Sequence, residues 1–211
     1  MQIFRQRSVQ RRIGRLLAHP VTLLALATIL ATVAGAWLTN YYQEQSWMRE
    51  KRFEVYRYRF DEGLKLLDEL SDVMGQRLFG LNRVVWVAKG TGTGTLDQVW
   101  QEYYESVVEW NATLARNKSR LARLVSTEAA EAFAGAQDAA LADAEAIPPS
   151  IHRSFLVTHQ KVRTVVDCVR DRCREPAKQQ ALQDAQEALT ALGEAIDAFL
   201  ANCTNQLYAS S

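Results

Sequence analysis

The three cysteines are the side chains whose chemistry depends most on where the chain places them. Cys168 and Cys173 are five residues apart, which puts them on different faces of an unbroken helix. If the helix ends near Arg170, the chain can turn, and an oxidising compartment would then allow a small local disulfide between them. Cys203 lies far along the next arm of that hairpin, and we expect it to be a buried thiol. Without a Cys-x-x-Cys spacing, the three cysteines are a poor zinc signal.

The histidines do not have the spacing of metal ligands. His152 and His159 are seven residues apart, about 10.5 Å along a helix, which is too far for both to bind one metal as an i, i+4 pair does. The Glu-x-x-His pairs of di-iron bundles are also missing, because Pro149 and Leu156 stand three positions before the two histidines. We therefore interpret them as core or boundary residues and expect no metal site.

No catalytic set stands out elsewhere in the chain. There is no Ser/His/Asp pattern, no paired carboxylates and no glycine fingerprint. Residues 89–95 (KGTGTGT) resemble a phosphate loop only in their glycines, since they lack the order Gly-x-x-x-x-Gly-Lys-Ser/Thr and no strand precedes them. We interpret this segment as a flexible connection. The sequence predicts no enzyme and no cofactor.

The charge balance excludes another class of partner. The chain has 25 basic and 24 acidic residues, and five arginines lie in the first 18 positions, which hold no acid. The remainder therefore carries 20 basic against 24 acidic residues, which is an ordinary surface without a basic field for nucleic acid.

These side chains would be positioned by an all-α chain with one membrane anchor. Residues 20–38 (PVTLLALATILATVAGAWL) are uncharged and long enough as a helix to span about 30 Å of hydrocarbon. A cleaved signal peptide is the alternative, with Ala34-Gly35-Ala36 as its cleavage site. The length of the apolar run and an aromatic belt beyond it favour a retained transmembrane helix over residues 19–40. The belt consists of Trp37, Tyr41, Tyr42 and Trp47.

The flanks predict the orientation of this helix. The positive-inside rule favours a short cytoplasmic tail over residues 1–18, whose arginines would contact anionic membrane lipid. A basic cluster over residues 49–59 weakens this assignment. We expect an inner (cytoplasmic) membrane location, with residues 41–211 as an extracytoplasmic, periplasmic domain. A tail of 18 residues is too short for an output domain, so any inward signal would need a partner.

The predicted span also has one face of small residues. Ala27, Ala31 and Gly35 recur every four positions, and Thr28, Thr32 and Ala36 lie beside them. Small residues at this spacing let two helix backbones approach closely within lipid. The alternative is that small residues are simply common in such helices. We predict a packing face for a second copy of the chain or for another membrane protein.

Beyond the span, the periodicity predicts an up-and-down bundle of about five helices. The expected helices cover residues 41–89, 96–125, 127 to about 146, 151 to about 170, and 177 to 208, with coiled-coil-like seams of spacings three and four. The first seam is Leu64, Leu67, Ser71, Met74, Leu78, Leu81, Val85 and Ala88. Residues 52–60 (RFEVYRYRF) also have a strand-like composition. Gly63, Gly75 and Gly80 each weaken a helix interior, and so indicate close packing or bends.

Aromatic side chains concentrate on the first two outer helices. Trp86 lies on the first, and Trp100, Tyr103 and Trp110 lie on the second. Core packing is the ordinary explanation, and a ligand-lining or interaction surface is the alternative. Asn117 interrupts the second seam, where it is either buried and fixes register or exposed at the seam edge.

The leading functional hypothesis is a non-enzymatic accessory or adaptor subunit of a membrane assembly. It depends on the small-residue face, the long seams and the missing catalytic set. The alternative is a ligand-sensing extracytoplasmic bundle that signals through a membrane partner. A Trp- and Tyr-lined pocket between the first two outer helices would favour the sensor, and a solid core there would count against it.

Overall fold

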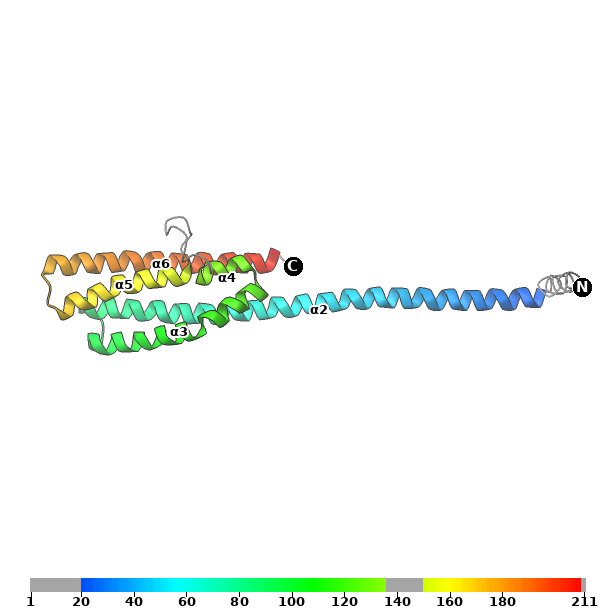
Figure 1. Cartoon of the computed structure of the whole chain (residues 1–211), viewed down its shortest axis with the longest axis horizontal. Coiled ribbons are helices and arrows are strands. Elements are labelled where there is room, and N and C mark those ends of the chain that lie inside the picture. The colour runs from blue at the N-terminus through cyan, green and yellow to red at the C-terminus, as the bar shows by residue number, and fades with distance from the viewer. Residues whose placement is uncertain (1–19, 136–149, 210–211) are drawn as a thin grey trace, which may run out of the picture. The chain divides into compact units, whose positions relative to one another are not determined.

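The computed structural model describes residues 20–135 and 150–209, and these form five helices and no strand. The helices are α2 (Pro20–Ala88), α3 (Leu96–Leu124), α4 (Thr127–Ala134), α5 (Ile151–Arg170) and α6 (Glu175–Ala209) (Figure 1). The prediction of an all-α fold is confirmed. The strand-like composition of residues 52–60 is misleading, because they lie within α2.

The chain divides into two compact units, with the boundary inside α2 between Val55 and Tyr56. In the first unit, α2 is exposed at Pro20 and Val21 and from Leu23 to Val55. Among the described residues, one helix is long and apolar enough to cross a membrane, and its apolar window has no buried part. The core helix of a soluble protein would be mostly buried, so the first unit contains the candidate span.

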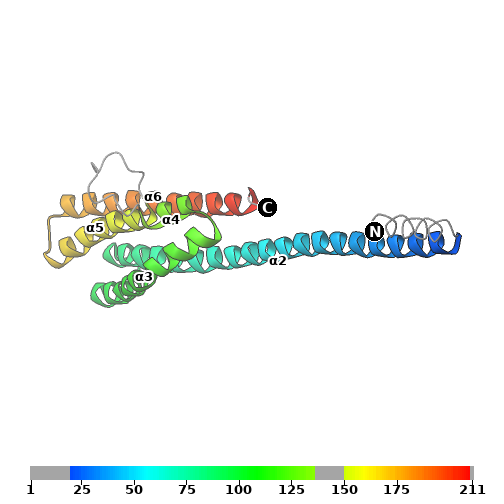
Figure 2. The ribbon, with the colours of Figure 1, turned by 45° about the vertical axis from the view of Figure 1, so that its right-hand side comes forward.

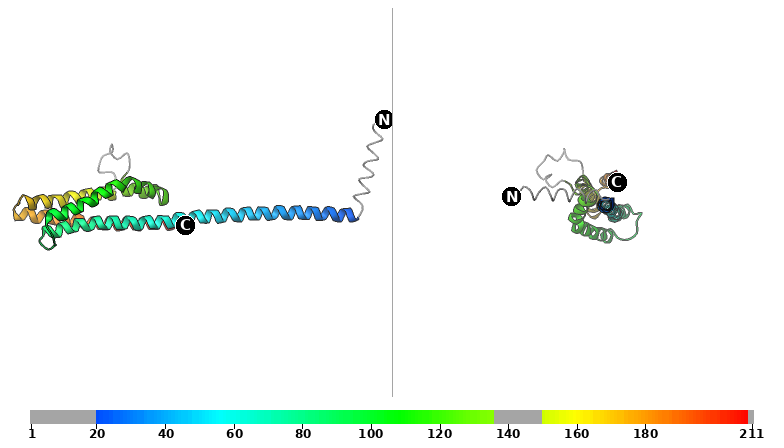
Figure 3. Two further views of the ribbon diagram at one scale, coloured as in Figure 1. Left: turned by 90° about the horizontal axis from the view of Figure 1, so that it is seen from below. Right: turned by 90° about the vertical axis from the view of Figure 1, so that its right-hand side faces the viewer.

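The second unit is a helical bundle. The part of α2 from Tyr56 to Ala88 runs beside α3, α5 and α6, and the four segments alternate in direction (Figures 1 and 2). The short helix α4 lies between α3 and α5 in the chain and packs against α6 through the rings of Phe133 and Phe199, whose centroids are 5.9 Å apart. Figure 3 gives a view along the helices. For these four segments the arrangement is the predicted up-and-down order.

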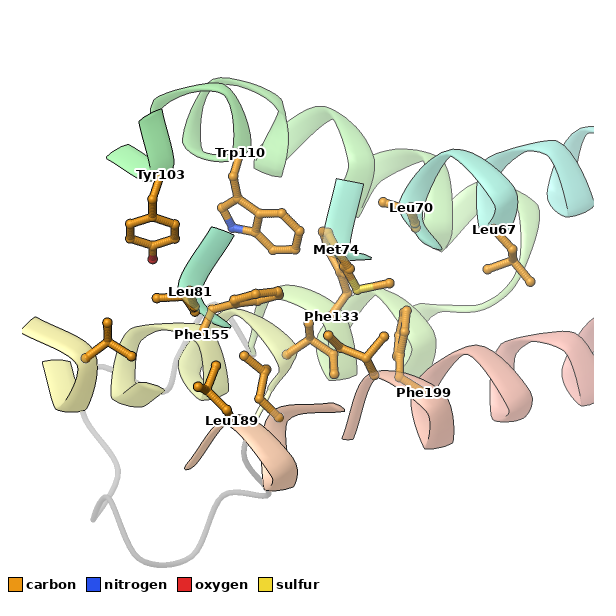
Figure 4. Close-up of a cluster of buried hydrophobic side chains, with 14 of the residues drawn as sticks. Leu67, Leu70, Met74, Leu81, Tyr103, Trp110, Phe133, Phe155, Leu189 and Phe199 are labelled. Atoms are coloured by element: carbon orange, nitrogen blue, oxygen red, sulfur yellow. The ribbon is translucent and has the colours of Figure 1, made fainter. Parts of the chain in front are cut away.

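One hydrophobic core runs through the bundle, and every helix of the second unit contributes to it. Figure 4 shows its central part, in which Met74 and Leu81 of α2 meet Tyr103 and Trp110 of α3. Phe133, Phe155, Leu189 and Phe199 complete this part from α4, α5 and α6. The burial of apolar side chains at spacings of three and four explains why these segments form helices that pack together.

The buried face of α2 includes most of the first predicted seam and is wider than that seam. Ser71 is exposed, although it was expected on the seam. A second row of α2 is buried beside the predicted one, because a helix in the middle of a bundle faces neighbours on two sides. This row consists of Leu66, Leu70, Arg77 and Val84.

The predicted helix starts agree with the observed caps. The Thr95 hydroxyl accepts from the Gln98 amide at 3.3 Å, and Ser126 and Ser150 cap α4 and α5 in the same way. The C-terminal end of α3 is capped by a side chain of α2. Arg59 donates from Nε to the Leu124 carbonyl at 3.0 Å and from Nη2 to the Val125 carbonyl at 3.1 Å. These carbonyls have no partner within their own helix, so Arg59 satisfies them.

The predicted third outer helix is wrong in its extent. Gly135 has a φ of +89° and ends α4 after Ala134, whereas one helix was expected to run to about residue 146. Glycine adopts this backbone conformation without the steric cost that a side chain would bring. Residues 136–149 lie outside the described part of the chain.

The helix glycines of the bundle divide into two kinds. A Cβ on Gly63 would lie 2.7 Å from Leu207 Cδ2 of α6, and one on Gly80 would lie 3.2 Å from Tyr103 Cδ2 of α3. A Cβ on Gly75 would meet nothing within 4 Å. Gly63 and Gly80 therefore mark close packing between helices, and Gly75 does not.

Candidate functional site

The small-residue face of the candidate span is uncovered in the first unit. Ala27, Ala31 and Gly35 are all exposed, and a Cβ on Gly35 would meet nothing within 4 Å. The neighbouring threonines do not project free hydroxyls, because Thr28 donates to the Leu24 carbonyl and Thr32 to the Thr28 carbonyl, each at 2.8 Å. The face therefore has only small side chains, and its threonine hydroxyls are satisfied by their own helix. Both properties allow a second helix to pack closely on it.

The aromatic belt beyond the span is also exposed. Trp37 and Tyr41 stack with centroids 5.8 Å apart, and Tyr42 and Trp47 are more than half exposed. Three hollows lie along this part of α2, between residues 38 and 52. All of their walls come from one helix, so none of them encloses a ligand.

Inside the bundle, three of the predicted aromatic residues meet the two histidines. Tyr103 and Trp110 are buried and point from α3 toward α5 (Figure 4). Trp100 lies at the edge of the same interface, with its ring centroid 5.3 Å from that of His159. The Trp110 ring packs against Phe133 of α4 and Phe155 of α5, with ring centroids 5.2 and 5.0 Å apart. This interface is filled by side chains, which is the solid core expected if the aromatic residues are structural.

Each histidine is hydrogen-bonded to an aromatic side chain. Tyr103 Oη lies 2.9 Å from His159 Nδ1, and Trp110 Nε1 donates to His152 Nδ1 at 3.1 Å. Because an indole N–H only donates, His152 Nδ1 must be an unprotonated acceptor in this arrangement. Burial, and then the positive charge of Arg77, lower the pKa of both His152 and His159, and Arg163 adds to the effect at His159. The imidazoles are thus held in their neutral form, as boundary residues of the core.

Arg77 is the central residue of this cluster, and sequence reasoning missed it. Its side chain is 1% exposed, and its guanidinium carbon lies 4.3 Å from the Phe155 ring centroid and 5.1 Å from that of Trp110. Burial lowers the Arg77 pKa, while the nearby Tyr103 phenol raises it. The signal was present in the sequence, since Arg77 continues the spacing of Leu66, Leu70 and Val84 on the second buried row.

Trp86 and Asn117 lie apart from this cluster. Trp86 is 43% exposed, and its ring meets Phe79 of the same helix edge-on, with centroids 5.9 Å apart. Asn117 is buried on α3, which decides between its two predicted positions. The structure therefore does not gather Trp86, Asn117 and the other aromatic residues into one site.

The cysteines lie where α5 ends and α6 begins. Cys168 and Cys173 are joined in a disulfide, with their Cα atoms 5.1 Å apart, across the turn that follows Arg170. The turn includes Arg172 at a φ of +54°, and the Cys173 N–H donates to the Cys168 carbonyl at 2.9 Å. Cys203 is a free, buried thiol on α6, and burial raises its pKa to about 12. It is therefore unreactive while the bundle is folded.

The described residues contain no group of three or more His, Cys, Asp or Glu side chains that could hold a metal ion. Comparison of the chain with models of known protein families, with characterised proteins and with solved structures finds no match. Functional assignment therefore depends on the two features described above, which are the uncovered face of the candidate span and the Arg77 cluster.

Proposed function

We propose that this protein is a non-enzymatic, single-pass membrane protein that acts as an accessory or adaptor subunit of a membrane assembly. Its partner is another membrane protein or a second copy of the chain, which packs on the span face of Ala27, Ala31 and Gly35. The observation that carries the proposal is that this face is exposed and smooth, with its threonine hydroxyls already bonded to their own helix. Membrane lipid surrounds the remainder of the span.

In this proposal the span lies in the inner (cytoplasmic) membrane, with the N-terminus in the cytoplasm and the bundle outside it. The arginines of residues 1–18 support this orientation through the positive-inside rule. The Cys168–Cys173 disulfide supports it independently, because disulfides persist in oxidising compartments outside the cytoplasm. A reporter that is active only in the cytoplasm, fused after Ser211, is expected to be inactive, and its activity would overturn the orientation.

The adaptor role is tested by purifying the tagged, full-length protein in a mild detergent and identifying what migrates with it. We expect a complex, either with itself or with a second membrane protein. Ala31→Leu adds bulk to the small-residue face and is expected to weaken the complex at least tenfold while the protein still inserts into the membrane.

The matched control is Val33→Phe. Val33 lies about 200° around the helix from Ala31, so its enlargement leaves the small-residue face intact. The complex is expected to survive this change. Two results would contradict the adaptor role: recovery of the unchanged protein only as a monomer, or equal complex formation by the two variants. The span would then serve only as a membrane anchor.

A second function is ligand sensing by the bundle. The filled interface around Tyr103 and Trp110 counts against it, and one specific observation favours it. The buried Arg77 guanidinium has two N–H groups without a hydrogen-bond partner among the described residues, at Nε and Nη1. Donors left unsatisfied in a core are unusual in structural packing alone. The sensing function requires that a ligand at this position changes the association of the span, which the purification experiment measures directly when it is repeated with the ligand present.

A further inference from the structure

Arg77 places a positive charge in the core of the bundle. Its side chain is 1% exposed, and no ion pair of Arg77 is found among the described residues. The surface arginines Arg83 and Arg120 of the same bundle are paired with Glu102 and Glu69. A buried charge without a counter-ion costs several kcal/mol in a folded protein, so this position requires an explanation.

Two aromatic rings compensate for part of that cost. The guanidinium carbon lies over the rings of Phe155 and Trp110, at 4.3 and 5.1 Å from their centroids. A ring face attracts a cation but accepts no strong hydrogen bond, and it leaves the in-plane N–H groups of the guanidinium unsatisfied. Arg77 Nε and Nη1 are those groups.

Among the described residues, the groups that act on Arg77 carry no negative charge, and a hydrogen bond links its side chain to that of Tyr103. Tyr103 of α3 acts on Arg77 as a neutral phenol, since burial raises its pKa more than Arg77 lowers it. His152 and His159 of α5 are within electrostatic range and are held neutral. Both imidazoles are only half-buried, so they are the groups of this cluster that solvent reaches.

We propose that Arg77 binds a small planar oxyanion, of the class of formate, acetate or nitrate, in the core between α2, α3 and α5. Such an anion supplies the missing counter-charge and accepts hydrogen bonds in the plane of the guanidinium. Because buried side chains, among them the rings of Trp110 and Phe155, surround the guanidinium, the proposal is limited to anions of a few non-hydrogen atoms. The anion enters past His152 and His159. This site goes beyond the adaptor role and does not depend on association through the span.

The test is thermal unfolding of the full-length protein in an uncharged detergent, at constant ionic strength maintained with sodium gluconate. Gluconate is replaced stepwise by formate, acetate, nitrate or sulfate, and constant ionic strength keeps the screening of surface charges equal. We expect at least one of the three planar anions to raise the melting temperature, whereas tetrahedral sulfate does not beyond its general salt effect. Well above the dissociation constant, each tenfold increase in the free anion concentration should shift the folding equilibrium about tenfold toward the folded state.

Variants of Arg77 assign the effect to the site. Arg77→Leu removes the charge and is expected to fold at least as stably as the natural chain, because apolar replacement of buried ions is often neutral or stabilising. Its melting temperature should no longer respond to the planar anions. Arg77→Lys keeps the charge but loses the planar donors, so the apparent affinity should fall at least tenfold. The matched control Arg120→Leu removes a surface arginine and should respond like the natural chain.

A titration read by tryptophan fluorescence is the second measurement, since Trp110 lies against Arg77. It does not require Arg77→Leu to fold. A saturable change with a planar anion in the natural chain, weakened in Arg77→Lys, supports the site. An equal response to all four anions, or an undiminished response in Arg77→Lys, overturns it. Binding of the anion without any change in span association would reject the sensing function and leave the site itself in place.

Discussion

The Trp110 indole donates a hydrogen bond from Nε1 to Nδ1 of His152 over 3.1 Å, and this bond exists only while that nitrogen carries no proton. The bond connects α3 to α5 on the side of the bundle where His159 and Tyr103 make a second connection at 2.9 Å. The charged groups that act on these imidazoles, Arg77 of α2 and Arg163 of α5, are both positive. Protonation of the histidines therefore opposes the packing of α3 on α5.

The bundle is expected to lose stability below about pH 6.5, the ordinary pKa of histidine. The pKa of His152 and His159 is lowered in the folded state, so the unfolded chain takes up protons first as the pH falls. The contribution of the two histidines is thus fully present above their unfolded pKa and is lost as the pH falls through the lower folded pKa. Thermal unfolding at pH 7.5 and 5.5, monitored by circular dichroism, measures the loss.

His152→Asn is the matched variant for this measurement. Its amide oxygen can accept from Trp110 Nε1, but the side chain does not titrate. The decrease in melting temperature between pH 7.5 and 5.5 should be smaller in this variant than in the natural chain. An equal decrease in both proteins would show that His152 does not cause it.

The two tryptophans Trp110 and Trp86 are expected to differ sharply in their contribution to stability. Trp110→Ala removes a buried ring that contacts Phe133, Phe155 and Arg77, and it should lower the free energy of unfolding by about 3–5 kcal/mol. Trp86→Ala removes a half-exposed ring and should cost less than about 1 kcal/mol. Chemical denaturation of both variants in the same detergent measures the difference. Comparable losses would contradict the assignment of Trp110 to the core.

The helices of this protein follow from local signals. Thr95, Ser126 and Ser150 are side chains that cap helices wherever they can reach the third amide ahead, and the apolar spacing continues from each of them. The strand-like composition of residues 52–60 did not outweigh the helical pattern on either side. Gly135 shows the limit of local reasoning, because an alanine-rich sequence on both sides predicted a continuous helix and the positive φ of one residue ends it.

The Arg77 cluster could not be predicted in the same way. An arginine on an amphipathic helix is ordinarily assigned to solvent, since burial of an unpaired charge is unfavourable. That Arg77 is buried depends on Phe155 and Trp110, which lie far away in the sequence and are brought over it only when α3 and α5 pack on α2. The two tryptophans differ in this respect, because local spacing places Trp110 on the seam of the second outer helix and leaves Trp86 off the first seam, which runs through Val85 and Ala88. Only the burial of Arg77 is decided by tertiary packing.

Gly75→Ala and Gly63→Ala should differ in their effect on the free energy of unfolding, although alanine favours the helix equally at both positions. At Gly75 a Cβ meets nothing within 4 Å, so alanine should stabilise the bundle by about 0.5–1 kcal/mol. At Gly63 the new Cβ would lie 2.7 Å from Leu207 Cδ2, and displacement of Leu207 should offset this gain by at least about 1 kcal/mol. Chemical denaturation measures both changes.

The background variant Leu207→Ala is the control for the glycine pair. With Leu207 shortened, Gly63→Ala should recover most of the gain seen at Gly75, because the two effects are coupled only through contact between positions 63 and 207. A gain at Gly63 in the natural background equal to that at Gly75 would contradict the close approach of α2 and α6 at this position.

The state of the three cysteines gives a prediction that separates folding from oxidation. In the oxidised, folded protein no thiol should react rapidly with a labelling reagent, because Cys168 and Cys173 are joined and Cys203 is buried with a pKa raised to about 12. Denaturation without a reductant should expose one thiol, and denaturation with a reductant should expose three. Mass spectrometry counts the labels. Reduction alone should leave the fold intact and lower the free energy of unfolding by no more than about 2 kcal/mol, since the loop closed by the disulfide is short. Three labels after denaturation without a reductant would show that the natural protein lacks the disulfide and would remove its support for an extracytoplasmic bundle.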